Sequence, residues 1–551
     1  MFSFQGLRPG GRRPLTEKKQ ILKSASIITL VTIASRILGY IRDQRLTLLL
    51  GTTLSADSFI LAYRIPNLLR RLVGEGSMTA SFIPVFTGYM ADKPREEVWE
   101  FANRLFWTLA VILAILTVLG MVFSPALIHM FTFSGKEQMR WDEAVHLNRI
   151  LFPYIFFIGL AALAMAILNC FHIFGPPAAT PILLNISIIV FSVGAVWRHF
   201  RDPAVALAVG VVVGGVLQFL VQVPLLVQQG MRFNFGLSFS HPGVRSVARL
   251  MVPGFFGIGI SQVNFFVDTF FANSAKMQSY VGTGALTSLY VADRVMELVL
   301  GGYAIAVGTA ILPMMSHQAS AGDIEGMKKT FGFSLRIVSF ITVPAALGLI
   351  ILREPIIRVL FEHGRFVAAS TRLTARALLY YAMGLPALAA VKLIVPAFYS
   401  TKDTKTPVWV AAYALVLNIL LNVLFLTYFL KKLQNGAPAL ATSFAGYFNF
   451  LMLFTIFRLR YGRLGTFDLL GSLTKILTCS GAMGVLCWVG LRFSQFSSYT
   501  RFLPQLAIFL ALISGATVVY LTLAWVLRCP EIEEVYGIAL RREPGPPAMM
   551  E

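Results

Sequence analysis

Separate runs of apolar residues, each long enough to cross a bilayer as a helix, constrain this chain more than any other feature. A spanning helix needs about 20 apolar residues that rise about 1.5 Å each. Only 13% of the residues are charged, whereas soluble domains carry about 25%. The sequence therefore predicts an all-α polytopic membrane protein with about 14 transmembrane helices. We expect them near residues 24–50, 55–90, 104–131, 149–171, 178–198, 203–228, 246–274, 283–316, 331–352, 373–399, 407–430, 436–458, 467–491 and 503–528.

An internal repeat relates the two halves of the chain. Four pairs of matching positions recur at a separation of 226–233 residues: Arg64 with Arg294, Pro84 with Pro313, Pro181 with Pro407, and Ala206 with Ala439. A six-helix offset preserves orientation in the membrane, as in transporters built from parallel repeats. We therefore predict two six-helix pseudo-symmetric lobes, followed by two further helices without a counterpart. The predicted domains are a tail (1–23), an N-lobe (24–230), a C-lobe (244–458), the last two helices (467–528) and a second tail (529–551).

The formal charge of +21 needs an explanation other than nucleic acid, because the sequence has no basic stripe or aromatic platform. Lys and Arg are modestly enriched in the loops on the side of the two termini, which predicts that both termini are cytoplasmic. An anionic substrate would account for the remaining excess. The four cysteines have no metal-ligand spacing and indicate buried thiols.

Charged residues interrupt the apolar sequence between Ser35 and Glu75 and again near Arg294. A charge at membrane depth costs roughly 2.5–3.5 kcal/mol, so such residues usually face a protein interior or a water-filled cavity. Arginine predominates, and its planar fork suits phosphate. The alternative is structural ion pairs or arginines that reach the interface, which we favour for Arg45 and Arg71. The candidate cavity residues are Arg36, Arg42, Asp43, Asp57, Arg64, Arg70, Arg71, Glu75, Asp293, Arg294 and Glu297.

A second polar group lies in the C-terminal half. Asp268 is the lone carboxylate of an apolar stretch, Asn418 and Asn422 share a helix face, and Thr442 lies in the next helix. Such oxygens suit a hard monovalent cation such as Na⁺, but ordinary interhelical hydrogen bonds are an equal alternative. The sequence shows no Walker A, HExxH or GxSxG motif in a plausible context, so we do not expect an enzyme.

Several charged motifs together resemble one known family over about residues 20–530. They are SRILGYIRD, ADSF, IPNLLRRLVGEG, YVADRVME, LLNIS and AFYSTKDTKTP. The chain resembles the MurJ (MviN) lipid II flippases of the multidrug/oligosaccharidyl-lipid/polysaccharide exporter superfamily. The resemblance implies fourteen helices around a cationic cavity in the bacterial cytoplasmic (inner) membrane. It also implies outward flipping of the undecaprenyl-diphosphate-linked peptidoglycan precursor, lipid II.

The resemblance also assigns residues. The arginines essential for activity would be Arg36, Arg42, Arg70 and Arg294, and Asp43, Asp57, Arg64, Arg71, Glu75, Asp293 and Glu297 would line the same cavity. The Na⁺ site of the family would map onto Asp268, Asn418, Asn422 and Thr442. Some members have an acid where this chain has Asn422, which leaves fewer anionic ligands. Residues 467–528 would form the groove for the lipid tail.

We expect alternating access, driven by membrane potential or a cation, with lipid II, membrane lipids and the cell-wall synthesis machinery as partners. Two alternatives remain. A related exporter of O-antigen-type lipid-linked oligosaccharide would share the cationic cavity, whereas an exporter of cationic drugs should have an acidic one. An integral membrane glycosyltransferase would need an essential extracytoplasmic acid, and Asp142 and Glu362 lack a catalytic setting.

Overall fold

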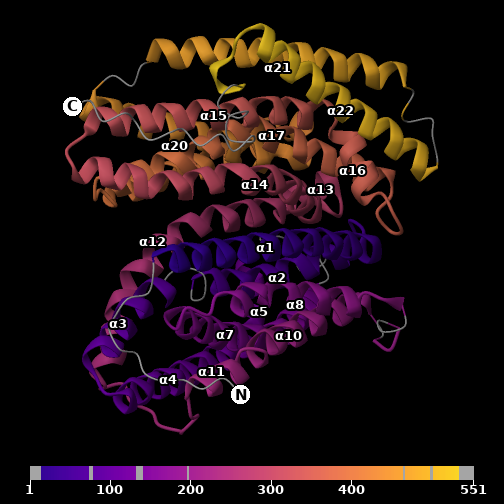
Figure 1. Ribbon diagram of the computed structural model, residues 1–551. Coiled ribbons are helices and arrows are strands. Elements are labelled where there is room, and N and C mark those ends of the chain that lie inside the picture. Colours follow the sequence, from indigo (N-terminus) through magenta and orange to yellow (C-terminus); the bar gives the residue numbers. More distant parts are fainter. Residues whose placement is uncertain are drawn as a thin grey trace, which may run out of the picture. The chain divides into compact units, whose positions relative to one another are not determined.

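The computed structural model shows helices joined by short connections (Figure 1). It describes residues 14–72, 78–131, 141–194, 198–200, 202–462, 466–494, 496 and 501–532. Within these residues there are helices and no strand, so the predicted all-α class is confirmed. Nine helical stretches of the described residues are long and apolar enough to cross a membrane, and Gly175–Phe191 is a shorter apolar helix. The chain is therefore a multi-pass membrane protein.

Contacts divide the chain into two units. Unit 1 comprises residues up to Leu46, Ala62–Pro125 and Val145–Ile258, and unit 2 comprises Thr47–Leu61, Ala126–Ala144 and the residues from Gly259. Segments 47–61 and 126–144 of the first half thus belong to the unit that contains the second half. The predicted domain boundaries stay a prediction.

Unit 1 contains α3 (Met78–Asp92), α4 (Arg95–Val122), α7 (Pro153–Cys170), α8 (Gly175–Phe191), α10 (Pro203–Leu220) and α11 (Val223–Gln229). Unit 2 contains α13 (Ala275–Val281), α14 (Ala285–Ser320), α15 (Ile324–Ile351), α16 (Arg353–Phe361), α17 (Ala368–Ser400), α18 (Lys405–Tyr428), α19 (Leu430–Leu433), η2 (Gln434–Gly436), α20 (Ala437–Tyr461), α21 (Thr466–Phe493) and α22 (Phe502–Val526). The helices that pass from one unit to the other are α1 (Pro14–Leu50), α2 (Leu54–Leu72), α5 (Ser124–Phe131), α6 (Trp141–Leu151) and α12 (Pro242–Ala272).

Small residues allow close helix packing in both units. In unit 1, a Cβ atom on Gly214 of α10 would lie 2.8 Å from Leu184 Cδ1 of α8. In unit 2, a Cβ atom on Gly384 of α17 would lie 2.8 Å from Ser443 Cα of α20. Helix association within a membrane depends on van der Waals packing of this kind. These glycines therefore bring neighbouring helices to the distance at which their side chains interlock.

Many of the exposed side chains on the long helices are large and apolar. Val118 of α4 is 58% exposed and Leu420 of α18 is 60% exposed. Water would penalise such surfaces, whereas the hydrocarbon interior of a bilayer accepts them. These faces are therefore the lipid-contacting surface.

The helix predicted over 104–131 begins earlier in the structure and is divided into two helices, of which the second ends at Phe131. Helix α4 begins at Arg95 and ends at Val122, and α5 begins at Ser124. Pro125 explains the break, because proline has no N–H to donate to the carbonyl four residues earlier. That carbonyl, Met121 O, accepts a hydrogen bond from Arg149 Nε at 3.3 Å instead.

Candidate functional site

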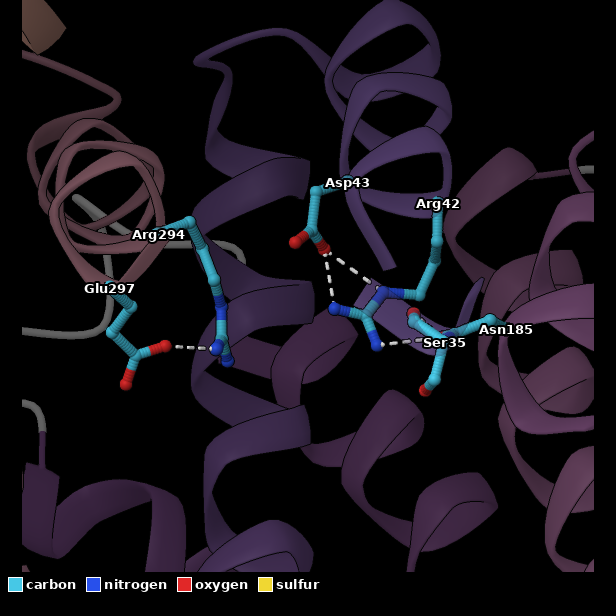
Figure 2. Close-up of polar contacts among 6 residues, drawn as sticks. All are labelled: Ser35, Arg42, Asp43, Asn185, Arg294 and Glu297. Atoms are coloured by element: carbon cyan, nitrogen blue, oxygen red, sulfur yellow. Dashed lines mark hydrogen bonds and ion pairs between the residues drawn. The ribbon is translucent and has the colours of Figure 1, made fainter. Parts of the chain in front are cut away.

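The charged part of α1 forms a hydrogen-bonded cluster within unit 1. Arg42 donates from Nε and Nη2 to Asp43 Oδ1 at 2.9 and 2.8 Å. Its Nη1 donates to Asn185 Oδ1 of α8 at 3.0 Å, and Asn185 Nδ2 donates to the carbonyl of Ser35 at 3.0 Å (Figure 2). Asp43 is buried, and only 13% of the Arg42 side chain is exposed. The guanidinium is thus held in one orientation between a carboxylate and an amide.

The other arginines of this region differ in their surroundings. Arg36 is exposed on α1. Arg64 of α2 is buried, with 5% exposure, and Arg70 Nε donates to Asn67 Oδ1 at 2.8 Å. Arg45 donates to the Ser192 hydroxyl and carbonyl at 3.1 and 2.9 Å, at the carboxyl end of α8.

Cations stabilise the negative end of a helix dipole, so the contacts of Arg45 agree with the structural role that we favoured for it. The side chain of Arg71 and the whole of Glu75 lie outside the described residues.

A second charged cluster lies on α14 in unit 2. Arg294 Nη1 lies 2.5 Å from Glu297 Oε2, one turn further along the helix (Figure 2). The Arg294 guanidinium carbon is 5.0 Å from the centroid of the Tyr290 ring, a cation–π contact. The Arg294 side chain is 23% exposed, and Asp293 is half-buried. Arg294 is therefore oriented by its own helix and still open to a ligand.

Asp57 has a structural partner that the sequence did not indicate. Its Oδ2 accepts from the Gly284 amide at 2.8 Å, and its Oδ1 accepts from the Thr287 amide and hydroxyl at 2.8 and 2.6 Å. These donors lie at the amino end of α14, where amides lack partners within the helix. Asp57 is 3% exposed, so its carboxylate is a buried cap for the helix that carries Arg294.

The polar residues predicted as a cation site come together in unit 2. Thr442 Oγ1 donates to the carboxylate of Asp268, 3.0 and 2.9 Å from its two oxygens, and Asn418 Nδ2 donates to Thr442 Oγ1 at 3.0 Å. Asn422 Nδ2 donates to Asn418 Oδ1 at 2.9 Å. The Tyr381 hydroxyl donates to Asp268 Oδ2 at 3.3 Å.

This oxygen set contains one carboxylate and suits a hard monovalent cation. The buried Asn422 Oδ1 has no hydrogen-bond partner among the described residues, which leaves it available as a further ligand. Across the described part of the chain, no three His, Cys, Asp or Glu side chains are grouped as a metal site. Na⁺ as the ligand of these residues stays a prediction.

An apolar cavity of 640 Å³ lies within unit 2, between α21 and the helices α15, α17 and α20. Leu347, Met383, Phe444 and Leu477 are among its mostly apolar lining residues. Its walls are chemically compatible with an alkyl or polyprenyl chain.

Asn185 and Tyr381 contact predicted site residues but were not themselves predicted. Asn185 orients Arg42 and Tyr381 contacts Asp268, but neither is charged. Asn185 does lie within the LLNIS motif, where a polar residue inside an apolar run is a usable signal. No comparable signal in the sequence marks Tyr381.

These features define a class. Many apolar helices, internally held arginines and a polar site at a helix junction are typical of a polytopic membrane transporter. A solved structure of an inward-facing multidrug resistance MATE family transporter of the MOP superfamily matches the fold, with a TM-score of 0.63 over 78% of this chain and 96% of that one, at 15% identity.

The family follows from closer matches. The family model "Lipid II flippase MurJ" matches residues 46–509. A probable lipid II flippase MurJ of Vibrio cholerae is 35% identical over 80% of this chain and 83% of its own length. A relative of the same description from Bdellovibrio bacteriovorus is 34% identical over 94% and 97%.

A solved structure of lipid II flippase MurJ in an inward closed conformation has a TM-score of 0.72 and 26% identity, over 94% of this chain and 99% of that one. The chain belongs to the MurJ lipid II flippase family.

Proposed function

We propose that this chain flips lipid II across the bacterial cytoplasmic membrane by alternating access, with both termini in the cytoplasm and without covalent change to the lipid. The observation that carries the proposal is the position of Arg42 between Asp43 and Asn185. A guanidinium that is partly buried in a membrane protein, oriented and locally neutralised, is ready to exchange its internal carboxylate for a ligand phosphate.

Arg42 and Arg294 act in the same way in this proposal. Each has an internal carboxylate, Asp43 or Glu297, that holds it while no ligand is bound. The diphosphate of the substrate then takes the place of the carboxylate, because a guanidinium binds phosphate oxygens in a bidentate manner. Arg36 and Arg70 complete the set that binds the headgroup.

Other predicted cavity residues have different roles in the proposed mechanism. Asp57 holds the amino end of α14, and Arg45 holds the carboxyl end of α8. Arg64, Arg71, Glu75 and Asp293 remain proposed cavity residues. The polyprenyl tail stays in apolar surroundings along α21, where the 640 Å³ cavity would accept part of it.

Membrane potential supplies the driving force in the proposal. Moving one negative charge outward against an inside-negative potential releases about 2.3 kcal/mol per 100 mV. A cation would modulate this cycle if Asp268, Asn418, Asn422 and Thr442 hold Na⁺. When bound, the ion supplies one positive charge that neutralises Asp268 at the junction of α12, α18 and α20.

Reconstituted vesicles provide the test. Purified protein is inserted into vesicles that contain labelled lipid II, and the fraction of lipid that changes leaflet is measured with and without an imposed potential. Arg42→Ala should reduce flipping to the level of empty vesicles. Arg249→Ala, which removes an exposed arginine of α12, should flip normally. Normal flipping by Arg42→Ala would refute the role of this cluster, and polymerised lipid II would instead indicate a glycosyltransferase.

A further inference from the structure

Unit 1 contains a second cavity, and none of its lining residues belongs to α1 or α2. It has a volume of 600 Å³ and lies between the first turns of α4 and the segment that follows α11. Its lining includes charged and aromatic side chains, namely Arg95, Trp99, Glu100, Arg104, Arg232 and Phe235. The proposed flipping mechanism does not use this cavity.

The lining is cationic. It contains three arginines against two glutamates, Glu96 and Glu100. The Arg104 side chain is 37% exposed and makes only a long ion pair to Glu100, at 3.4 Å. Arg232 is exposed, and its guanidinium makes no hydrogen bond or ion pair with any residue that the structure describes. At least one guanidinium is therefore available to an anion.

The segment that follows α11, residues 231–241, brings apolar side chains to this cavity. Phe233, Phe235, Leu237 and Phe239 alternate along it. The Phe235 ring lies 5.1 Å from Trp107 of α4, and Phe233 lies 5.1 Å from Phe106. Phe235 and Phe239 are nevertheless 71% and 60% exposed. Tryptophan is enriched at the membrane–water interface, and the exposed rings beside Trp107 offer an apolar surface to lipid chains.

The length of α4 indicates that the cavity lies at the depth of the lipid headgroups. Its 28 residues span about 42 Å, whereas the hydrocarbon core is about 30 Å thick. The exposed apolar residues Ile112, Val118 and Val122 lie in the second half of the helix. The first turns, from Arg95 to about Arg104, therefore extend into the headgroup layer.

We propose that this cavity binds the phosphate headgroup of an anionic phospholipid, in the leaflet on the Arg95 side of the membrane. Arg104 and Arg232 bind the phosphate, and the acyl chains pass over Phe235 and Phe239. A lipid fits better than a soluble phosphate because Phe235, which lines the cavity, and Phe239 on the same segment expose apolar rings that acyl chains can cover. The segment 231–241 then anchors unit 1 to that leaflet.

Native mass spectrometry of the full chain in detergent tests the proposal. The protein is titrated with phosphatidylglycerol or with phosphatidylcholine of the same acyl chains, and the dissociation constants are measured. One basic residue near an anionic surface contributes about fivefold in affinity, or about 1 kcal/mol. Arg104→Gln combined with Arg232→Gln should therefore weaken phosphatidylglycerol binding about 30-fold and leave phosphatidylcholine binding unchanged.

Two matched variants separate the site from general charge and from misfolding. Arg245→Gln combined with Arg249→Gln removes two exposed arginines outside the cavity lining and should keep wild-type affinity. Gly236→Ala keeps every charge, but its Cβ would lie 2.5 Å from Arg104 Nη1. It displaces only the flexible end of that side chain and should weaken binding about fivefold.

Three outcomes would overturn the proposal. Both double variants could lose affinity equally, which would indicate a diffuse charge effect. Phosphatidylcholine could bind as tightly as phosphatidylglycerol, so that no anion is recognised. Soluble glycerol phosphate at millimolar concentration could displace the lipid, which would make this a site for a free phosphate. Lipid II flipping is measured separately, and its failure or success leaves this result unchanged.

Discussion

Substitution of Asp57 tests the cap on α14 most sharply. The carboxylate accepts three hydrogen bonds, from the Gly284 amide and from the Thr287 amide and hydroxyl. Asp57→Ala leaves both amides buried without an acceptor. Each such donor costs about 1–3 kcal/mol, so we expect a loss of about 4 kcal/mol in the free energy of unfolding.

Asp57→Asn should cost less. The amide oxygen of asparagine can still accept from Thr287, but its NH₂ group would face the Gly284 N–H, donor against donor. One buried amide then loses its acceptor, so the expected loss is about 2 kcal/mol. The control is Asp323→Ala, because Asp323 caps α15 through the Gly326 amide at 2.7 Å but is exposed. Removal of an exposed helix cap lowers the free energy of unfolding by about 1 kcal/mol.

Unfolding in mixed micelles, followed by circular dichroism, measures all three values. The expected order of destabilisation is Asp57→Ala, then Asp57→Asn, then Asp323→Ala. The interpretation of Asp57 as a buried cap fails if Asp57→Ala costs no more than Asp323→Ala.

Three further predictions concern single residues. Arg42→Lys should reduce lipid II flipping at least tenfold, about 1.4 kcal/mol, because a lysine cannot contact Asp43 and a phosphate in the bidentate manner of a guanidinium; wild-type flipping would contradict this. Asp268→Asn should abolish any rise in melting temperature that Na⁺, relative to K⁺, produces in the wild type, and a persisting rise would place the ion elsewhere. For Asp403, burial alone would raise the pKa, but hydrogen bonds from Thr406 and Arg460 lower it from 3.8 to about 2. The contribution of ionised Asp403 to the free energy of unfolding is therefore complete above pH 4 and is lost as the pH falls towards 2. Asp403→Asn should remove this part of the pH dependence of the free energy of unfolding. An unchanged pH dependence in the variant would contradict the prediction.

Features that depend on local pattern could be predicted from the sequence. Apolar runs of sufficient length indicated the helices, because a bilayer imposes that length. The spacing of Asn418 and Asn422 put both on one helix face, and the structure brings them to Asp268 through Thr442. Isolated polar residues in apolar helices form hydrogen bonds with one another across helices, so the proximity of these residues could be expected.

Features that depend on partners far apart in the chain could not be predicted. Asp57 had the sequence signature of a cavity carboxylate, and only the fold shows that the amino end of α14 lies beside it. Asn185 orients Arg42 across 143 positions, which helical periodicity cannot show. The break before α5 was present in the sequence as Pro125, but the apolar run on both sides hid it.

The central claim is that arginines held by internal carboxylates bind the diphosphate of lipid II. The most direct measurement is the leaflet in which lipid II accumulates in cells whose only copy of this protein carries Arg294→Ala, at wild-type abundance in the membrane. The claim predicts accumulation in the inner leaflet, as in cells depleted of the protein. A wild-type distribution between the leaflets would contradict it.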